Sequence, residues 1–197
     1  ALTAFEAALA DFPRADHRHT IIHADLIPEK MQERAAALGI CIAVQPAFLD
    51  WEQEPGEYLE SILGERAKNM LPLKSLVDKG IKLSAGSDAP CTIPDPIKSI
   101  HLCVNHPNST ESVSVLDALR MHTSWAAYMS FDEDERGILK AGYVADFVVL
   151  SENPLETPKE KLKNIKVLDT YFSGKKYEGQ SKSSLGLACR SLFKKAR

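Results

Sequence analysis

Two short apolar segments, each entered from a helix pattern that ends at a glycine, constrain the fold of this chain most. ICIAV (40–44) follows Gly39, and IKLSA (81–85) follows Gly80. Glycine is favoured just past the end of a helix, and a continuous apolar run of this length is typical of a strand that is buried on both faces. A third apolar run covers 18–25. The order strand, helix, strand, loop, helix, strand indicates parallel strands with crossover helices, an α/β fold.

Helix and loop signals lie between and after these strands. Pro28 opens one helix pattern, since proline is favoured at the first helical position. The stretch after Pro46 is polar and irregular, which predicts a loop beyond the carboxyl end of a strand, where α/β folds bind ligands. The expected helices are 1–16, 29–38, 72–80 and 112–129, and the expected loop is 47–69.

The pattern changes near residue 137. Segments 137–154 and 167–179 are rich in β-branched and aromatic residues, with turn signals at Ala-Gly, Asn-Pro and Ser-Gly. They predict a separate small β unit. The last residues hold five basic and no acidic side chains, which fits either a functional basic tail or a solvated terminus. The predicted divisions are 1–130 for the α/β part, 131–180 for the β unit and 181–197 for the basic tail.

Length and charge narrow the function classes. The chain has 197 residues and a net charge of −3, so it lacks the basic character typical of nucleic-acid binding. It contains no apolar run of about 18 residues that could span a membrane. Its four cysteines form no C-x-x-C pair, which favours unpaired thiols in a reducing, cytoplasmic compartment. A complete (β/α)₈ barrel needs about 250 residues, so any barrel here is a piece of one.

Two polar residues lie at the predicted carboxyl ends of strands. On one strand face His19 and His23 would be about 13 Å apart, at about 3.3 Å per residue. They cannot share a zinc ion that binds each ligand at about 2 Å. His23, at the strand end, is therefore the candidate ligand, against the alternative of a hydrogen-bonded core histidine. Asp88, in GSDAP, follows the third strand and could bind a metal, accept a proton or form a turn. Together they predict half of a metal site, because zinc needs at least three protein ligands.

Other chemistries fit less well. Pro90 rules out the G-x-S-x-G nucleophile motif, and neither a P-loop nor G-x-G-x-x-G is present. Cys91 lacks the histidine and asparagine pattern of a cysteine nucleophile. His101 and His106 either line a substrate pocket or are surface or capping residues.

Six segments taken in order resemble the C-terminal half of an amidohydrolase, in the YtcJ-like branch of metal-dependent hydrolases. The resemblance implies the last strands, six to eight, of a (β/α)₈ TIM barrel, followed by C-terminal strands of a small β-sandwich. It implies that His23 is the metal-binding histidine of strand six. Asp88 matches the aspartate of strand eight, which contacts the metal and acts as general base. The matching segments are RHTIIHAD, GICIAVQP, GIKLSAGSDAP, the helix ending in HTSWAAY, RGILKAGYVADFVVLSENP and VLDTYFSGKKYEG.

The function implied by the resemblance is hydrolysis of an amide or another C–N bond in a small-molecule substrate. A divalent metal, expected to be zinc, activates water and polarises the carbonyl in such enzymes. Asp88 would take the proton of the water and deliver it to the leaving nitrogen. Candidate substrate contacts in the loop 48–66 are Trp51, Tyr58 and Arg66, against the alternative of ordinary loop packing.

Two features depart from the family pattern. Ile22 stands where the family often has glutamate before the histidine of strand six. The only H-x-H, at 17–19, belongs to the same predicted strand as His23 and cannot replace the first-strand motif. The chain also starts in a helix pattern without an initiator Met. We therefore expect the other ligands in an upstream N-terminal segment of the same protein, and the chain alone to be inactive. Exposed apolar sheet edges would then favour self-association into a homo-oligomer.

Two alternatives stay open. The first is a non-catalytic binding or regulatory module of amidohydrolase-like fold, which Ile22 favours. The second is a self-contained small α/β domain with a β appendage. An H-x-H motif after a strand upstream of residue 1 would support the enzyme, and its absence would support the module.

Overall fold

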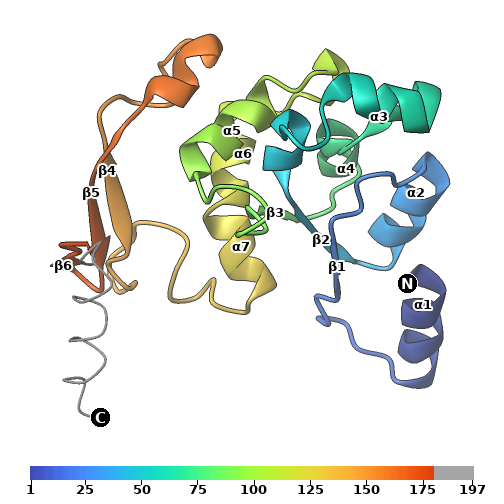
Figure 1. Cartoon of the computed structure of the whole chain (residues 1–197). Coiled ribbons are helices and arrows are strands. Elements are labelled where there is room, and N and C mark those ends of the chain that lie inside the picture. The colour runs from blue at the N-terminus through green and yellow to red at the C-terminus, as the bar shows by residue number, and fades with distance from the viewer. Residues whose placement is uncertain (180–197) are drawn as a thin grey trace, which may run out of the picture.

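Two separate sheets form the framework of the computed structural model, which describes residues 1–179 (Figure 1). The parallel sheet has the order β1-β2-β3, and the antiparallel sheet has the order β4-β5-β6. The predicted parallel strands are confirmed, and strands are present in the predicted β unit. The assignment of these strands to a β-sandwich stays a prediction, and the predicted tail 181–197 lies outside the described residues. The strands are β1 (Thr20–Ile22), β2 (Cys41–Val44), β3 (Leu83–Ala85), β4 (Phe147–Leu150), β5 (Val167–Phe172) and β6 (Lys175–Lys176).

Helices precede, connect and follow the strands. The α-helices are α1 (Leu2–Asp11), α2 (Glu29–Ala37), α3 (Gly56–Leu63), α4 (Leu73–Asp78), α5 (Pro96–Val104), α6 (Val115–Met121) and α7 (Ser124–Met129). The 3₁₀ helices are η1 (Pro46–Asp50), η2 (Gly64–Asn69), η3 (Ser109–Glu111) and η4 (Lys159–Asn164). No helix within residues 1–179 is long and apolar enough to cross a membrane.

The two faces of the parallel sheet differ in burial. Ile42 and Leu83 are paired neighbours, and both are fully buried in the core. On the other face the register aligns Ile22, Ala43 and Ser84 in one row. Ile22 in that row is 64% exposed. Ala43 and Ser84 are partly buried, and parallel sheets are normally covered on both faces, so Ile22 is an apolar side chain that the described residues leave uncovered at the edge of this face.

The first strand is shorter than the predicted run 18–25. Arg18, His23 and Ala24 have φ angles of 46°, 70° and 60°, in the left-handed region that breaks a strand. His19 therefore lies ahead of β1 instead of within it, and its ring stacks on that of His17 with centroids 4.5 Å apart. The prediction that His23 follows the strand directly is confirmed.

Two expectations about helices were wrong in part, and one helix was not predicted. The predicted helix 112–129 is two helices, because Thr123 leaves the helical region with φ −135° and ψ −99°. The predicted loop 47–69 contains α3 and two 3₁₀ helices. Helix α5 was missed, although its signals are present: Pro96 is at a first helical position and the Asp95 side chain accepts from Lys98 N.

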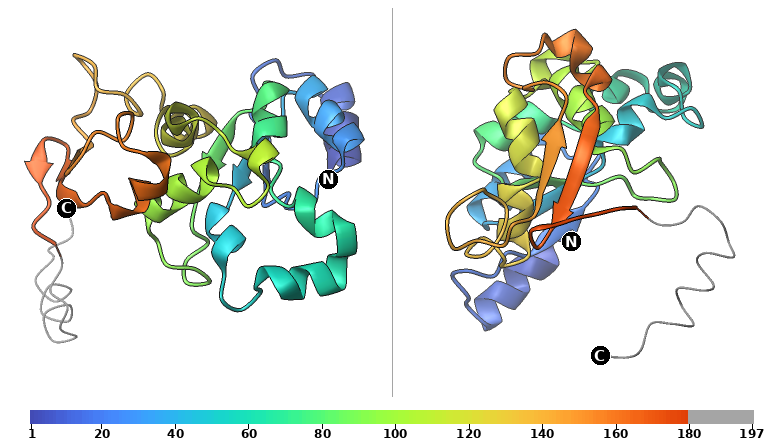
Figure 2. Two further views of the ribbon diagram at one scale, coloured as in Figure 1. Left: turned by 90° about the horizontal axis from the view of Figure 1, so that it is seen from above. Right: turned by 90° about the vertical axis from the view of Figure 1, so that its left-hand side faces the viewer.

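Helices also join the two sheets. α6 and α7 pack against β3, α5 packs against α6 and η1, and η4 packs against α5. η4 lies between β4 and β5 in sequence, and it places Leu162 in the main core, 1% exposed. Figure 2 shows α5 to α7 between the parallel and the antiparallel sheet. The β unit is therefore attached to the α/β part through η4.

Candidate metal centre

His23 is held at the carboxyl end of β1 by its backbone. Its N–H donates to the Ala43 carbonyl at 2.8 Å, which continues the ladder one residue past the strand. The left-handed φ angles of His23 and Ala24 then turn the chain away from the sheet. The imidazole is left 41% exposed at this edge of the parallel sheet.

Asp88 lies in a tight turn after β3. Gly86 N donates to the Val44 carbonyl at 2.9 Å, and Cys91 N donates to the Asp88 carbonyl at 2.8 Å. The Thr92 hydroxyl donates to the Ser87 carbonyl and closes the turn. Asp88 has a φ of 53°, which aspartate tolerates better than most residues, and its side chain is 42% exposed.

The structure brings the two predicted ligands together. His23 Nε2 lies 3.9 Å from Asp88 Oδ2, which is too long for a hydrogen bond. Two ligands of a tetrahedral zinc ion, each about 2.0–2.1 Å from the metal, are about 3.3 Å apart. A shift of about half an ångström would therefore suit a shared zinc ion, and imidazole nitrogen and carboxylate oxygen are both zinc donors. Within residues 1–179 no third histidine, cysteine, aspartate or glutamate completes a metal-binding group with them.

Two polar residues at the same sheet edge escaped the sequence analysis. Asp25 Oδ1 and Gln45 Oε1 are buried without a hydrogen-bond partner among the described residues. Burial raises the pKa of the Asp25 carboxyl; the charge of His23 opposes that shift and the charge of Glu54 adds to it. Gln45 is 6% exposed and follows the central strand β2. The signal for both was available: Asp25 is the last residue of the predicted run 18–25, and Gln45 directly follows the predicted strand 40–44.

Aromatic side chains stand beside His23. The Phe48 ring is 5.9 Å from the imidazole, and the Trp51 ring meets Phe48 edge-on at 5.0 Å. Trp51 is thus linked to the site through Phe48. Tyr58, on α3, is 47% exposed, and Arg66, in η2, donates to the Leu63 carbonyl. A substrate-contact role for Trp51, Tyr58 and Arg66 stays a prediction.

The described cysteines are free thiols, as expected. Cys41 and Cys103 are buried and Cys91 is exposed. Burial raises the pKa of the Cys103 thiol to about 12 and also raises that of Cys41. Buried thiols of this kind are unreactive, because the thiolate is the nucleophilic form.

A parallel α/β sheet with a histidine and an aspartate at its carboxyl edge is an arrangement of metal-dependent hydrolases of barrel type. A profile of the amidohydrolase family matches residues 1–176. The chain therefore belongs to the amidohydrolase family.

Two curated relatives show how much of such a protein is present. The YtcJ protein of Bacillus subtilis is 30% identical over 178 residues, which are 85% of this chain and 33% of YtcJ. The N-substituted formamide deformylase of Arthrobacter pascens is 29% identical over 183 residues, which are 88% of this chain and 33% of the deformylase. The chain thus spans about a third of the length of these relatives.

Solved structures agree in fold. A metal-dependent hydrolase of Pyrococcus furiosus, whose function is uncharacterized, superposes with a TM-score of 0.63 at 32% identity, over 78% of this chain and 32% of its own. An adenosine deaminase of Xanthomonas campestris with bound zinc has a TM-score of 0.65 at 19% identity, over 95% of this chain and 44% of its own. The second likeness concerns the fold alone. The mixed α/β chain therefore aligns with part of amidohydrolase structures.

Proposed function

We propose that this chain is part of a metal-dependent hydrolase that cleaves an amide or another C–N bond with water. The observation that carries the proposal is the approach of His23 Nε2 and Asp88 Oδ2 to 3.9 Å at the carboxyl edge of one parallel sheet. This edge is where barrel enzymes place their catalytic groups. The activity named for the Arthrobacter relative, deformylation of N-substituted formamides, supports a C–N substrate.

The donor set fits a divalent metal, with His23 and Asp88 as two of its ligands. Such a metal, zinc in this proposal, lowers the pKa of water toward neutrality and polarises the substrate carbonyl when it is bound. The Asp88 carboxylate makes no hydrogen bond within residues 1–179, so an oxygen is available to accept a proton from the attacking water. The same carboxyl group then delivers that proton to the leaving nitrogen. His23 keeps its imidazole in place through the ladder bond of its backbone N–H.

The remaining ligands would come from the segment that precedes this chain in the whole protein. The 64% exposure of Ile22 supports this, because further barrel strands would cover that apolar side chain. The isolated 197-residue chain should accordingly retain no stoichiometric zinc and hydrolyse no amide. A stoichiometric metal with measurable turnover in the isolated chain would contradict a shared site.

The test uses the whole protein, with the upstream segment of the gene restored. Asp88→Asn should lower kcat/KM on a panel of formamides and other amides by at least about 100-fold, the size of a lost general base. His23→Ala should lower the zinc content as measured by elemental analysis. Asp134→Asn is the matched control, because Asp134 is exposed and forms no ion pair within residues 1–179. It should leave both kcat/KM and the zinc content unchanged. Unchanged turnover in Asp88→Asn would contradict the proposal and favour a non-catalytic module, the alternative to which Ile22 points.

A further inference from the structure

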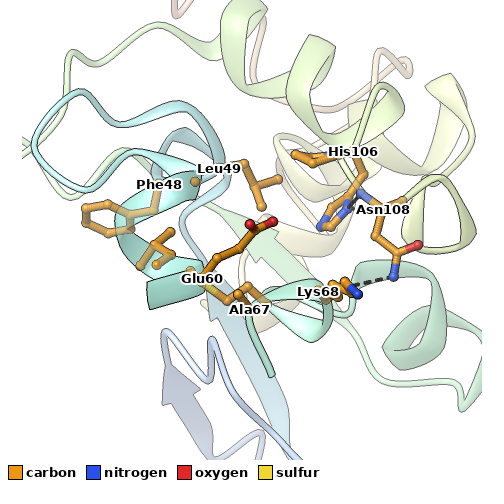
Figure 3. A pocket seen from close by; sticks show the side chains of 11 residues that line it. Phe48, Leu49, Glu60, Ala67, Lys68, His106 and Asn108 are labelled. Carbon is orange, nitrogen blue, oxygen red and sulfur yellow. Dashed lines mark hydrogen bonds between the residues drawn. The ribbon is translucent and has the colours of Figure 1, made fainter. Parts of the chain in front are cut away.

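A pocket of about 400 Å³ lies beside the aromatic residues of the candidate metal centre. Its walls come from η1, α3, η2, Met70 and the segment 106–108, as the close view in Figure 3 shows. The volume falls in the range of small-molecule sites, about 300–1,000 Å³. All of its lining residues belong to the described part of this chain, so the isolated chain can be tested for binding.

The walls are mostly apolar and are tied together by hydrogen bonds. His106, which is buried, contacts the Leu71 carbonyl through Nε2 at 3.1 Å and accepts from Asn108 N at Nδ1. The Asn108 amide donates to the Lys68 carbonyl at 3.0 Å. These bonds fasten the segment after α5 to η2 and leave the His106 ring satisfied, so its role is to hold the wall. The apolar lining residues are Phe48, Leu49, Leu59, Ala67 and Met70.

One charged group in the pocket has no ion pair. The Glu60 carboxylate points into the space between Leu49 and the wall of His106 (Figure 3). Among the ion pairs of residues 1–179 none involves Glu60, which is an exposed residue. The Lys68 ammonium, the other charge in the lining, pairs with Glu65 at 2.7 Å, and this hydrogen bond raises the pKa of Lys68 most, while the charge of Glu60 adds a smaller part. An unpaired carboxylate against an apolar wall favours a cation that carries an apolar body. An aromatic wall such as Phe48 adds to that preference.

We propose that this pocket binds a primary ammonium ion with an apolar, aryl-sized body, with the ammonium on Glu60 and the body against Leu59 and Met70. Phe48 lines the pocket and also lies 5.9 Å from the His23 ring, so the pocket adjoins the candidate metal centre. The amine released from an N-substituted amide has this chemistry. The assignment of the ligand as the leaving amine rests on the proposed function, whereas the binding site itself does not.

The test titrates the 197-residue chain, without metal, with three probes of matched shape: 2-phenylethylamine, 2-phenylethanol and 3-phenylpropionate. Chemical-shift changes or calorimetry at pH 7 give each dissociation constant. The amine should bind at least tenfold more tightly than the alcohol, and the carboxylate should bind most weakly. The advantage of the amine should shrink as salt is added, because the Glu60 pair is partly open to solvent.

Two variants separate the charge of Glu60 from general effects. Glu60→Gln keeps the shape and should reduce the preference for amine over alcohol to less than twofold. Glu57→Gln, an exposed position on the same helix α3 that does not line the pocket, should keep the full preference. The proposal would be overturned if the amine and the alcohol bound equally well, or if the carboxylate bound more tightly than the amine. It would also be overturned if both variants lost the preference for the amine to the same extent, or if no probe showed saturable binding. Amine binding without hydrolysis by the whole protein would overturn the proposed function and leave the pocket assignment standing.

Discussion

The Arg18 guanidinium forms a two-armed ion pair with the Glu133 carboxylate, with N···O distances of 2.6 and 2.7 Å. It also lies between the Tyr128 and Phe131 rings, 3.9 and 4.1 Å from their centroids, and its side chain is 8% exposed. Arg18 lies two residues before β1, the strand that His23 follows directly, and Tyr128 belongs to α7, which packs against β3. The Arg18–Glu133 pair therefore holds the segment that leads into β1 and His23 close to α7. Helix α7 in turn packs against β3, the strand that leads to Asp88.

Replacing Arg18 by lysine should lower the melting temperature even though the charge is kept. A lysine ammonium makes neither the two parallel bonds to Glu133 nor the planar stack between two rings. Arg18 holds the pKa of Glu133 below its usual 4.5, so the pair stabilises the fold above that pH and the stabilisation is lost as pH falls. The wild type should thus melt at a higher temperature than Arg18→Lys by the largest margin at pH 7, and this margin should shrink below pH 4.5. Arg14→Lys, at an exposed position, should melt like the wild type.

The free energy of unfolding should fall as pH drops from about 7 toward 5. Burial lowers the pKa of both His122 and His106 from the usual 6.5, while their hydrogen bonds to backbone carbonyls oppose the shift. The unfolded chain then binds more protons than the folded chain in this window, so protonation favours unfolding, by at most about 1.4 kcal/mol per pH unit for each histidine. Urea unfolding at several pH values measures the slope. His122→Gln should make it shallower, and a slope that stays the same would exclude a contribution from His122.

Gln45→Met should raise the stability of the isolated chain. Gln45 Oε1 is buried without a partner, and an apolar side chain of similar size removes that cost, about 1 kcal/mol. Gln53→Met, at an exposed position, should change stability by less than about 0.5 kcal/mol. Chemical denaturation of the three proteins provides the comparison. A destabilised Gln45→Met would show that the amide makes a bond that the structure lacks.

Gly137→Ala and Gly142→Ala form a matched pair, because both glycines have a φ of +90°. A Cβ at Gly142 meets nothing within 4 Å, so alanine there costs only the left-handed backbone, about 1–2 kcal/mol. A Cβ at Gly137 would lie 2.7 Å from Ala127 Cβ and 2.9 Å from Ser124 Cα. Overpacking against α7 should add about 1–3 kcal/mol to the loss. Equal free energies of unfolding for the two variants would contradict this close approach.

Local patterns predicted the sheets better than the helices around the site. Glycine ends and apolar runs located β2 and β3 correctly, because both signals depend on neighbouring residues. The polar stretch after Pro46 looked like a loop, yet Leu59 and Met70 reach the wall of a pocket there. Their partial burial depends on contacts with residues far along the chain, which no local pattern reports.

The sequence by itself determined that β1, β2 and β3 form, that they run parallel, and that His23 and Asp88 follow two of them. Only the tertiary structure decided the distance between these side chains, since it depends on the register of β1, β2 and β3 and on the left-handed turns after the strands. It also decided that Glu60 faces an apolar pocket, because residues 106–108 supply the opposite wall. Strand formation follows from the hydrophobic pattern of adjacent residues, whereas a site needs side chains from distant segments held at fixed separations by packing.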